Sequence, residues 1–360
     1  MFSKLSKQHS KTKFGQNRIN FQHKKLTQFS SKTKKNQRGG LFDHSKEVIP
    51  LPSTEYNPQT LELVGEGGFG VLAMGETESG QFAIKLIKSI SQCGSAKAES
   101  SIHNEVYQTY LEFAEYAHNN PAYQLLYIPQ PLSYQEFPLR IVQIGEKKFE
   151  TRCSYTMEYM SPIDIGNNIH DGQPIQLHVA YALKQGFIEE NPYRGYMIGM
   201  GKLDSLLQHL NELYPNKKQP TSSTQIYEAI GIAVGCAIFG SGHNPIDFQF
   251  MISEYNGEFR LIGFDFGMFT KIKEYDKKTM SEIYDYLLNS PYIGMHLTSD
   301  IELLPFIKGL VSTVKPLVQL YGSDVPQYHG FQYLLDNFLS EFDELEPYGQ
   351  YFDELAQNKI

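Results

Sequence analysis

Cysteine is scarce in this sequence. The 360 residues contain three cysteines, Cys93, Cys153 and Cys236, which lie far apart. They form neither a CxxC pair nor a Cys/His pattern with zinc-ligand spacing. We therefore expect no zinc site and no disulfide framework. A reducing compartment, the cytoplasm, is the default expectation for such a chain.

Long apolar runs are also lacking. The longest, residues 229–239, is too short to cross a bilayer, so we expect no transmembrane segment. The first residues hold no apolar core of the kind that a secretory signal needs. These absences favour a globular chain outside the membrane.

Acidic residues are absent from the beginning of the chain. Residues 1–40 contain eleven Lys or Arg and no acid, whereas the remaining 320 contain 21 basic and 40 acidic residues, a balance of −19. An acidic body argues against nucleic acid as the main ligand of the folded part. We expect residues 1–48 to form a disordered basic arm. Alternatives are mitochondrial or nuclear targeting and contact with an anionic surface such as lipid or RNA.

A glycine-rich stretch, residues 61–87, is the most informative part of the sequence. Its apolar runs, 61–64, 71–74 and 82–87, are separated by two glycine-containing breaks, which predicts a strand–turn–strand–turn–strand meander. The third strand carries Lys85. The first break, GEGGFG, contains Gly65, Gly67, Gly68 and Gly70. A dinucleotide-binding fingerprint would need a helix directly after these glycines, but another strand follows instead.

A glycine-rich hairpin followed by a lysine on the next strand resembles the nucleotide lobe of the protein-kinase superfamily. The resemblance implies an α+β, bilobal fold, with a small antiparallel β lobe holding one helix and a larger, mainly helical lobe. We place the small lobe at residues 49–160 and the large lobe at 161–360. The implied cofactors are ATP and Mg²⁺, with the four glycines and Lys85 around the phosphates.

A helix is predicted over residues 95–117, directly after the lysine strand. In the kinase family this helix carries a glutamate that pairs with the lysine. Glu105 lies twenty residues beyond Lys85 and is the glutamate we expect, with Glu99 as the alternative. Glu105 flanks an apolar stripe made of Ile102, Val106, Thr109 and Phe113.

Strands are predicted at 125–134, 139–145 and 148–160. The last ends in Tyr-Thr-Met-Glu-Tyr-Met and resembles the strand that enters the kinase hinge. The resemblance implies that Met157 is the gatekeeper and that the backbones of Glu158 and Met160 meet the adenine edge.

Residues 161–222 form an insertion longer than a compact kinase needs. They contain Gly- and Asn-rich loops, a predicted helix at 202–213 and, at 217–223, a predicted mobile connection. We interpret the insertion as a family-specific substrate or partner surface. A buried helix is predicted to follow at 224–239.

A strand ending in Asp265-Phe266-Gly267 matches the family's DFG motif, in which the aspartate ligates magnesium. The loop before it departs from the HRDxxxxN pattern. Asp247 lies eighteen residues before Asp265, as a catalytic base would, but then Ile252 occupies the metal-binding position. If Gln249 takes that position instead, Asn244 occupies the base position. The sequence leaves both alignments open.

The run from Asp247 to Ile252 also resembles a poorly characterised, mainly fungal kinase-like domain, which implies a kinase fold with divergent chemistry. We expect His243 to be structural. No APE signature follows Gly267, and the chain continues in helical patterns at 278–288, 300–321 and 331–342. The acidic residues near the end of the chain are interpreted as a solvated face.

Together these patterns predict an atypical phosphotransferase that uses Mg·ATP and acts on protein. Lys85 would hold the α- and β-phosphates and Glu105 would orient it. Asp265 would bind metal with Gln249 as a substitute second ligand, and Asp247 would be a base reached through a rearranged loop. Two alternatives stay open. One is a pseudokinase that serves as a nucleotide-binding interaction scaffold, and the other is a small-molecule kinase.

Overall fold

The described part of the chain is an α+β structure. The computed structural model describes residues 61–66, 69–77, 80–160, 163, 175–177, 189–191, 195–198, 203–290, 293 and 300–357. These residues all belong to one unit, Gly39–Ile360. The predicted basic arm lies outside the described residues, as do Gly67, Gly68 and much of the insertion.

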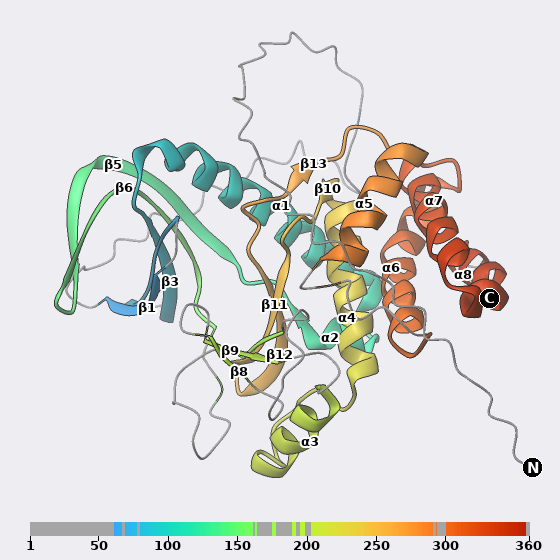
Figure 1. Cartoon of the computed structure of the whole chain (residues 1–360), viewed down its shortest axis with the longest axis horizontal. Helices are drawn as coiled ribbons and strands as arrows, with labels where there is room; N and C mark the ends of the chain where they lie inside the picture. The colour runs from blue at the N-terminus through green and yellow to red at the C-terminus, as the bar shows by residue number, and fades with distance from the viewer. Residues whose placement is uncertain are drawn as a thin grey trace, which may run out of the picture. The chain divides into compact units, whose positions relative to one another are not determined.

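An antiparallel sheet of five strands forms the first part of the fold, in the order β1-β2-β3-β6-β5 (Figure 1). Its strands are β1 (Glu62–Glu66), β2 (Gly70–Thr77), β3 (Gly80–Ile87), β5 (Pro131–Ile144) and β6 (Lys147–Glu158). The glycine-rich meander is therefore confirmed as β1, β2 and β3. Alternate residues of these strands point to one face and form an apolar cluster that includes Val71, Ile84 and Leu86.

The predicted strand at 125–134 is wrong in part. Its place is taken by a short helix α2 (Pro121–Leu125), the short strand β4 (Leu126–Tyr127) and the beginning of β5, which continues to Ile144. Asn120 explains the helix, because its side-chain oxygen accepts the backbone N–H groups of Ala122 and Tyr123. Pro121 at the first helical position adds to this start signal.

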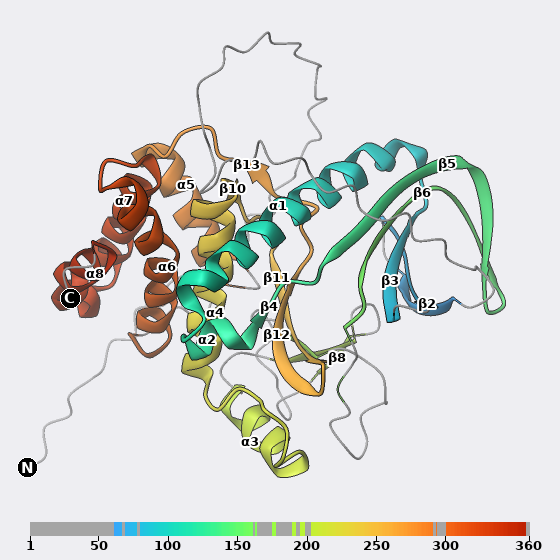
Figure 2. The same cartoon turned by 180° about the vertical axis from the view of Figure 1, so that it is seen from behind.

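Helix α1 (Cys93–Ala117) confirms the predicted helix and connects the sheet to the helical part of the fold. Near its beginning, Cys93 and Ala96 pack in a small cluster with Ile87 of β3. Farther along, Val106 and Phe113 belong to the large apolar core of the helical part. Figures 1 and 2 show α1 running from the β5–β6 pair to α4.

A disulfide joins Cys93 to Cys153, which is contrary to the expectation of no disulfide framework. The two residues are 60 apart in sequence, and their spacing follows no local motif. They meet because Cys93 is the first residue of α1 and Cys153 lies on β6, the strand against which α1 packs. Cys236 is free and buried.

The helical part is built around α4 (Ser223–Gly235), which continues in a π-helical turn (Cys236–Gly240), and α6 (Asp300–Tyr321). The remaining helices are α3 (Leu203–Leu213), α5 (Lys277–Asn289), α7 (Pro326–Glu341) and α8 (Gly349–Ala356). Helices α4 and α6 approach closely because glycines stand at the contact. A Cβ at Gly231 would lie 2.1 Å from the Phe306 carbonyl oxygen, and one at Gly309 would lie 2.2 Å from that of Glu228.

Among the described residues, two helical stretches are long and apolar enough to cross a membrane by length and composition alone, Ser223–Gly240 and Leu303–Tyr321. The first includes and exceeds the apolar run 229–239 that we considered too short. Within the structure 83% and 67% of these stretches are buried. Central helices of a folded core pass the same test, so the finding is weak evidence for a membrane span.

A mixed sheet combines strands from separate parts of the chain, with the strand order β4-β12-β11-β7-β9-β8. Its central hairpin is β11 (Gln249–Tyr255) and β12 (Glu258–Phe264), joined through Asn256 and Gly257, both with positive φ. Three short strands come from the insertion: β7 (Ile175–Leu177), β8 (Glu189–Asn191) and β9 (Gly195–Ile198). The insertion therefore extends the sheet that holds the predicted metal-binding residues.

Residues 217–223, predicted to be a mobile connection, are bound to this hairpin. Lys217 Nζ lies 2.5 Å from Glu254 Oε2 and 5.1 Å from the centre of the Phe259 ring. The Phe259 N–H donates to the Lys218 carbonyl at 2.9 Å.

We predict that Gly309→Ala destabilises the protein by about 2–3 kcal/mol, because its methyl group would overlap the α4 backbone. Gly94→Ala is the control, since a Cβ at Gly94 meets nothing within 4 Å. It should be neutral or stabilising by up to about 1 kcal/mol. Urea unfolding of both variants tests this, and equal stabilities would contradict the close α4–α6 contact.

Candidate functional site

A half-buried ion pair between Lys85 and Glu99 lies at the centre of the candidate site. Lys85 Nζ donates to both carboxylate oxygens, at 2.9 and 2.8 Å. The side chains are 24% and 9% exposed. Burial raises the pKa of Glu99, whereas the charge and hydrogen bonds of Lys85 lower it. An ammonium group has three donors, so one remains on Lys85 for a further acceptor.

The predicted pairing of Glu105 with Lys85 is wrong. Glu105 lies six residues beyond Glu99, which is about 9 Å along α1 and about 240° around it. Glu99 therefore faces Lys85 on β3. Glu105 faces Lys271, which follows the Asp265 motif in the chain. Two glutamates six residues apart on this helix therefore have different partners.

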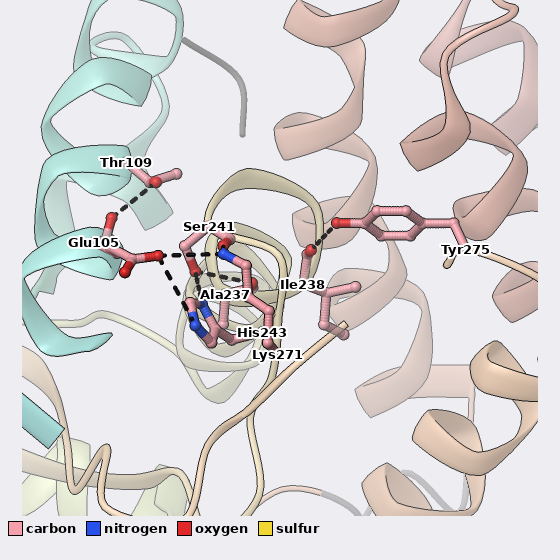
Figure 3. A network of polar contacts seen from close by, with 8 residues as sticks. All are labelled: Glu105, Thr109, Ala237, Ile238, Ser241, His243, Lys271 and Tyr275. Carbon is pink, nitrogen blue, oxygen red and sulfur yellow. Dashed lines mark hydrogen bonds and ion pairs between the residues drawn. The ribbon is translucent and has the colours of Figure 1, made fainter. Parts of the chain in front are cut away.

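Glu105 instead belongs to a polar network around the paired strands β10 (His243–Asn244) and β13 (Thr270–Lys271), shown in Figure 3. Its Oε2 lies 3.2 Å from Lys271 Nζ and 3.9 Å from His243 Nε2. Lys271 also donates to the Ser241 carbonyl at 2.8 Å. Burial lowers the pKa of His243 to about 4, with a further decrease from Lys271. These contacts fit the structural role that we expected for His243.

Asp265 lies next to Glu99 and Gln249. Gln249 Nε2 donates to Asp265 Oδ2 at 3.0 Å. A Cβ on Gly267 would lie 3.3 Å from Glu99 Oε2 and 3.5 Å from Asp265 Oδ1, so the two carboxylates flank this glycine. The negative charge of Asp265 also raises the pKa of Glu99, as a lesser cause after burial. Lys85, Glu99, Gln249 and Asp265 therefore form one cluster, which we call the Lys85–Asp265 cluster.

The contact between Gln249 and Asp265 distinguishes the two alignments of the preceding loop. Ile252, which the first alignment puts at the metal-binding position, is fully buried and pairs with Leu261 and Ile175 inside the sheet. Gln249 begins β11 and faces Asp265 directly. The geometry agrees with the second alignment, in which Asn244 takes the base position.

Two aspartates have an unusual backbone conformation: Asp265 of the cluster, and Asp247, two residues before Gln249. Asp265 has φ 66° and Asp247 has φ 63°, in the left-handed region that side chains other than glycine rarely adopt. Such residues cost about 1–3 kcal/mol each and occur disproportionately at functional sites. The backbone N–H of Asp247 donates to the Tyr286 hydroxyl on α5, which fixes the turn that carries it.

Glu158, a predicted hinge residue, uses part of its hydrogen-bonding capacity within the protein. Its backbone N–H donates to the Gln130 carbonyl at 3.0 Å. Its carboxylate accepts from the Tyr127 hydroxyl at 2.5 Å and from the Gln130 N–H at 2.7 Å. Of the polar groups of Glu158, its backbone N–H and carboxylate are thus already hydrogen-bonded, which leaves its carbonyl for the predicted contact with the adenine edge. Met160, the second predicted hinge residue, is buried at the end of the strand.

The glycine-rich loop is partly described. Gly70 requires glycine, because a Cβ would lie 2.5 Å from the Leu86 carbonyl oxygen on β3. A Cβ at Gly65 would meet nothing within 4 Å. Phe69, between the two, is 61% exposed. Gly67 and Gly68 lie outside the described residues, so their predicted phosphate contacts stay predictions.

His103 is a site residue that the sequence analysis missed. It is almost fully buried on α1, one turn beyond Glu99, and its ring stacks on Phe266 with centroids 4.2 Å apart. Its Nε2–H donates to the Pro129 carbonyl at 2.7 Å, so its Nδ1 accepts from the Tyr155 hydroxyl. Burial lowers the pKa of His103 to about 3. The neutral ring thus fixes Phe266, the residue after Asp265.

The donor set suits magnesium shared with a phosphate. Asp265 supplies a carboxylate next to Gln249, and Glu99 is neutralised by Lys85. Magnesium is usually bound by one or two carboxylates together with waters and phosphate oxygens. No group of three or more His, Cys, Asp or Glu that could enclose a metal occurs among the described residues. Asp265 therefore fits as a ligand of a nucleotide-bound ion, and Gln249 would join it through its amide oxygen after the amide turns.

Comparison with known proteins gives no further guide. Neither the family models nor the curated proteins include a significant match to this chain.

We predict that His103 makes folding stability depend on pH. Because its pKa is lowered from 6.5 to about 3, stability is lost as the pH falls below 6.5. The loss is about 1.4 kcal/mol per pH unit for one proton. Between pH 7 and 5, His103→Gln should take up about one proton fewer on unfolding than the wild type. Denaturant unfolding at several pH values measures this, with the exposed His118→Gln as control. An unchanged slope in His103→Gln would contradict the buried neutral ring.

Proposed function

We propose that this chain has a protein-kinase-like fold and binds ATP with Mg²⁺ at the Lys85–Asp265 cluster. The observation that carries the proposal is the contact of Lys85 with both oxygens of Glu99, with Asp265 directly beside the pair. Lys85 would use its third donor on the α- and β-phosphates. Asp265, with Gln249, would hold the metal that bridges the β- and γ-phosphates.

Charge supports this assignment. The cluster contains one lysine and two carboxylates, a formal charge of −1. A divalent cation would offset that charge and attract the phosphates, and Lys85 would stabilise them further. Gly70, the last glycine of the glycine-rich loop, lets β2 approach the β3 backbone next to Lys85, which supports a phosphate site there.

We propose phosphoryl transfer to protein as the activity, with Asp247 as a base reached through a rearranged loop, because the alignment that fits Gln249 puts Asn244 at the regular base position. The left-handed backbone of Asp247 supports this role. Phosphoryl transfer depends mostly on positioning and electrostatics, so a divergent base is compatible with activity. The disordered basic arm, its alternative role of contacting an anionic surface, and the cytoplasmic location also stay proposals. The Cys93–Cys153 disulfide is more typical of oxidising compartments, and therefore counts against the cytoplasm.

Two alternatives each have an observation in their favour. The contact between Gln249 and Asp265 puts Asn244 at the base position, and an amide cannot accept a proton from a substrate. This favours a nucleotide-binding interaction scaffold. The chain from Gly267 to the beginning of α5 at Lys277 is short, which leaves little room for a peptide-positioning segment and favours a small-molecule kinase.

We predict that Mg·ATP stabilises the wild-type protein against heat. At a concentration of 100 times Kd the gain is about 2.7 kcal/mol, or roughly 5–10 °C in Tm. Lys85→Ala and Asp265→Ala should lose this shift and reduce any ATP turnover by about 100-fold or more. Lys308→Ala is the control, because Lys308 pairs with Glu228 in the helical part.

A matched pair of variants tests the corrected partner of Lys85. Glu99→Gln should weaken Mg·ATP binding, because Lys85 loses the charge that holds it. Glu105→Gln should change binding little, because Glu105 contacts Lys271 and His243. A thermal shift without turnover would favour the scaffold, and turnover that Asp247→Asn abolishes would favour the enzyme. No shift in folded wild-type protein would refute the nucleotide site.

A further inference from the structure

The beginning of α1 is held by the disulfide and by few other contacts. Gln92, at the N-cap, makes no side-chain cap hydrogen bond, and the first turn holds no acidic residue. A 3-10 turn (Ile90–Gln92) precedes the helix, and the Cys93 N–H donates to the Ile90 carbonyl there. Gln92 caps none of the N–H groups that follow, and such a helix end frays more readily than one with a side-chain cap. The apolar cluster around it is small, with Ile87, Cys93, Ala96 and Cys153 as its buried members. The Tyr134 hydroxyl adds one hydrogen bond, to the Cys93 carbonyl at 2.9 Å.

Helix α1 is attached to β6 at two points, and Glu99 lies between them. Cys93 is bonded to Cys153, and His103 is hydrogen-bonded to Tyr155. Cys153 and Tyr155 are two residues apart on a strand, so they point to the same face of the sheet. Tyr155 is also the register partner of Lys85 on β3. The two attachments therefore fix the helix over the strand pair that carries the lysine.

We propose that the Cys93–Cys153 disulfide is a redox-sensitive crosslink that positions Glu99 on Lys85, so that its reduction weakens Mg·ATP binding. Reduction removes the covalent attachment on the N-terminal side of Glu99, where the Tyr134 hydrogen bond and the small apolar cluster remain, and leaves the His103 attachment on the other side intact. The first turns of α1 can then fray, and Lys85 loses its partner for part of the time. The inference rests on the proposed nucleotide site and concerns its regulation.

The chemistry needs a dithiol as reductant, either a dithiol oxidoreductase or, in the laboratory, dithiothreitol. Its thiolate attacks Cys93 Sγ, since Cys93 is 8% exposed and Cys153 is fully buried. The Cys93–Cys153 bond breaks and Cys153 leaves as a thiol. The second thiol of the reductant then displaces Cys93 and closes the reductant's own disulfide. The protein gains two electrons and two protons.

The first arm of the test needs no nucleotide. Oxidised and reduced full-length protein are desalted and treated with acetic anhydride, and acetylation of each lysine is followed by peptide mass spectrometry. Reduction should raise the rate at Lys85 severalfold relative to Lys308, which serves as the internal reference. Circular dichroism confirms that the reduced protein is folded at the temperature used. An unchanged rate at Lys85 would overturn the inference.

The second arm measures Mg·ATP affinity in both redox states. Reduction should weaken binding by the wild type about tenfold, which corresponds to about 1.4 kcal/mol. In Glu99→Gln it should change binding less than about twofold, because the crosslink acts through Glu99. Equal losses in both proteins would mean that the disulfide acts only through general stability, and would overturn the proposed positioning.

Two cysteine variants complete the design. The Cys93→Ala/Cys153→Ala double variant should bind like the reduced wild type and ignore dithiothreitol. Cys236→Ala, which keeps the disulfide, should respond like the wild type, and a lost response there would contradict the inference. If oxidised protein binds no nucleotide but its Lys85 still becomes reactive on reduction, the proposed function fails while the positioning role of the crosslink stands.

Discussion

The pairing of Lys85 with Glu99 depends on α1 belonging to two cores at once. Its first turns pack with β3 and β6, and its later turns pack in the core of the helical part. Both partners of the pair are half-buried or more, so either charge alone would be costly to keep out of water. The sheet supplies the lysine and the helix supplies the glutamate. Any shift of α1 along β6 would therefore change the cluster before it changed either core.

Local patterns in the sequence were enough to predict the meander, the position of Lys85 on its third strand, and the strand that ends directly before Asp265. Each depends on neighbouring residues: glycines at turns, alternating apolar residues in strands, and a short motif at a strand end. The choice between Glu99 and Glu105 was of a different kind. Counting back from Phe113 in steps of three and four gives Tyr110, Val106, His103 and Glu99, a stripe that the structure buries. The stripe we chose shares Val106 and Phe113 with this one but contains Ile102 and Thr109 in place of His103 and Tyr110, and it led to Glu105.

Long-range contacts account for most of the other errors. The disulfide joins residues 60 apart, and only the packing of α1 on β6 brings them together. Strands β7, β8 and β9 are three or four residues long, too short for a periodic signal. The position of Gln249 beside Asp265 follows from the register of the β11–β12 hairpin, in which Gln249 pairs with Phe264. None of these contacts can be predicted from the local sequence around the residues that make them.

The π-helical turn at the end of α4 sets the direction in which the chain leaves that helix. The Ser241 N–H donates to the Cys236 carbonyl at 2.8 Å, five residues back, so the turn holds one residue more than an α-helical turn. One residue corresponds to about 100° of rotation around a helix. A regular α-helical end would therefore release the chain in another direction and take His243 away from Glu105. The contact between the end of one helix and the side of another thus depends on a single residue of helical phase.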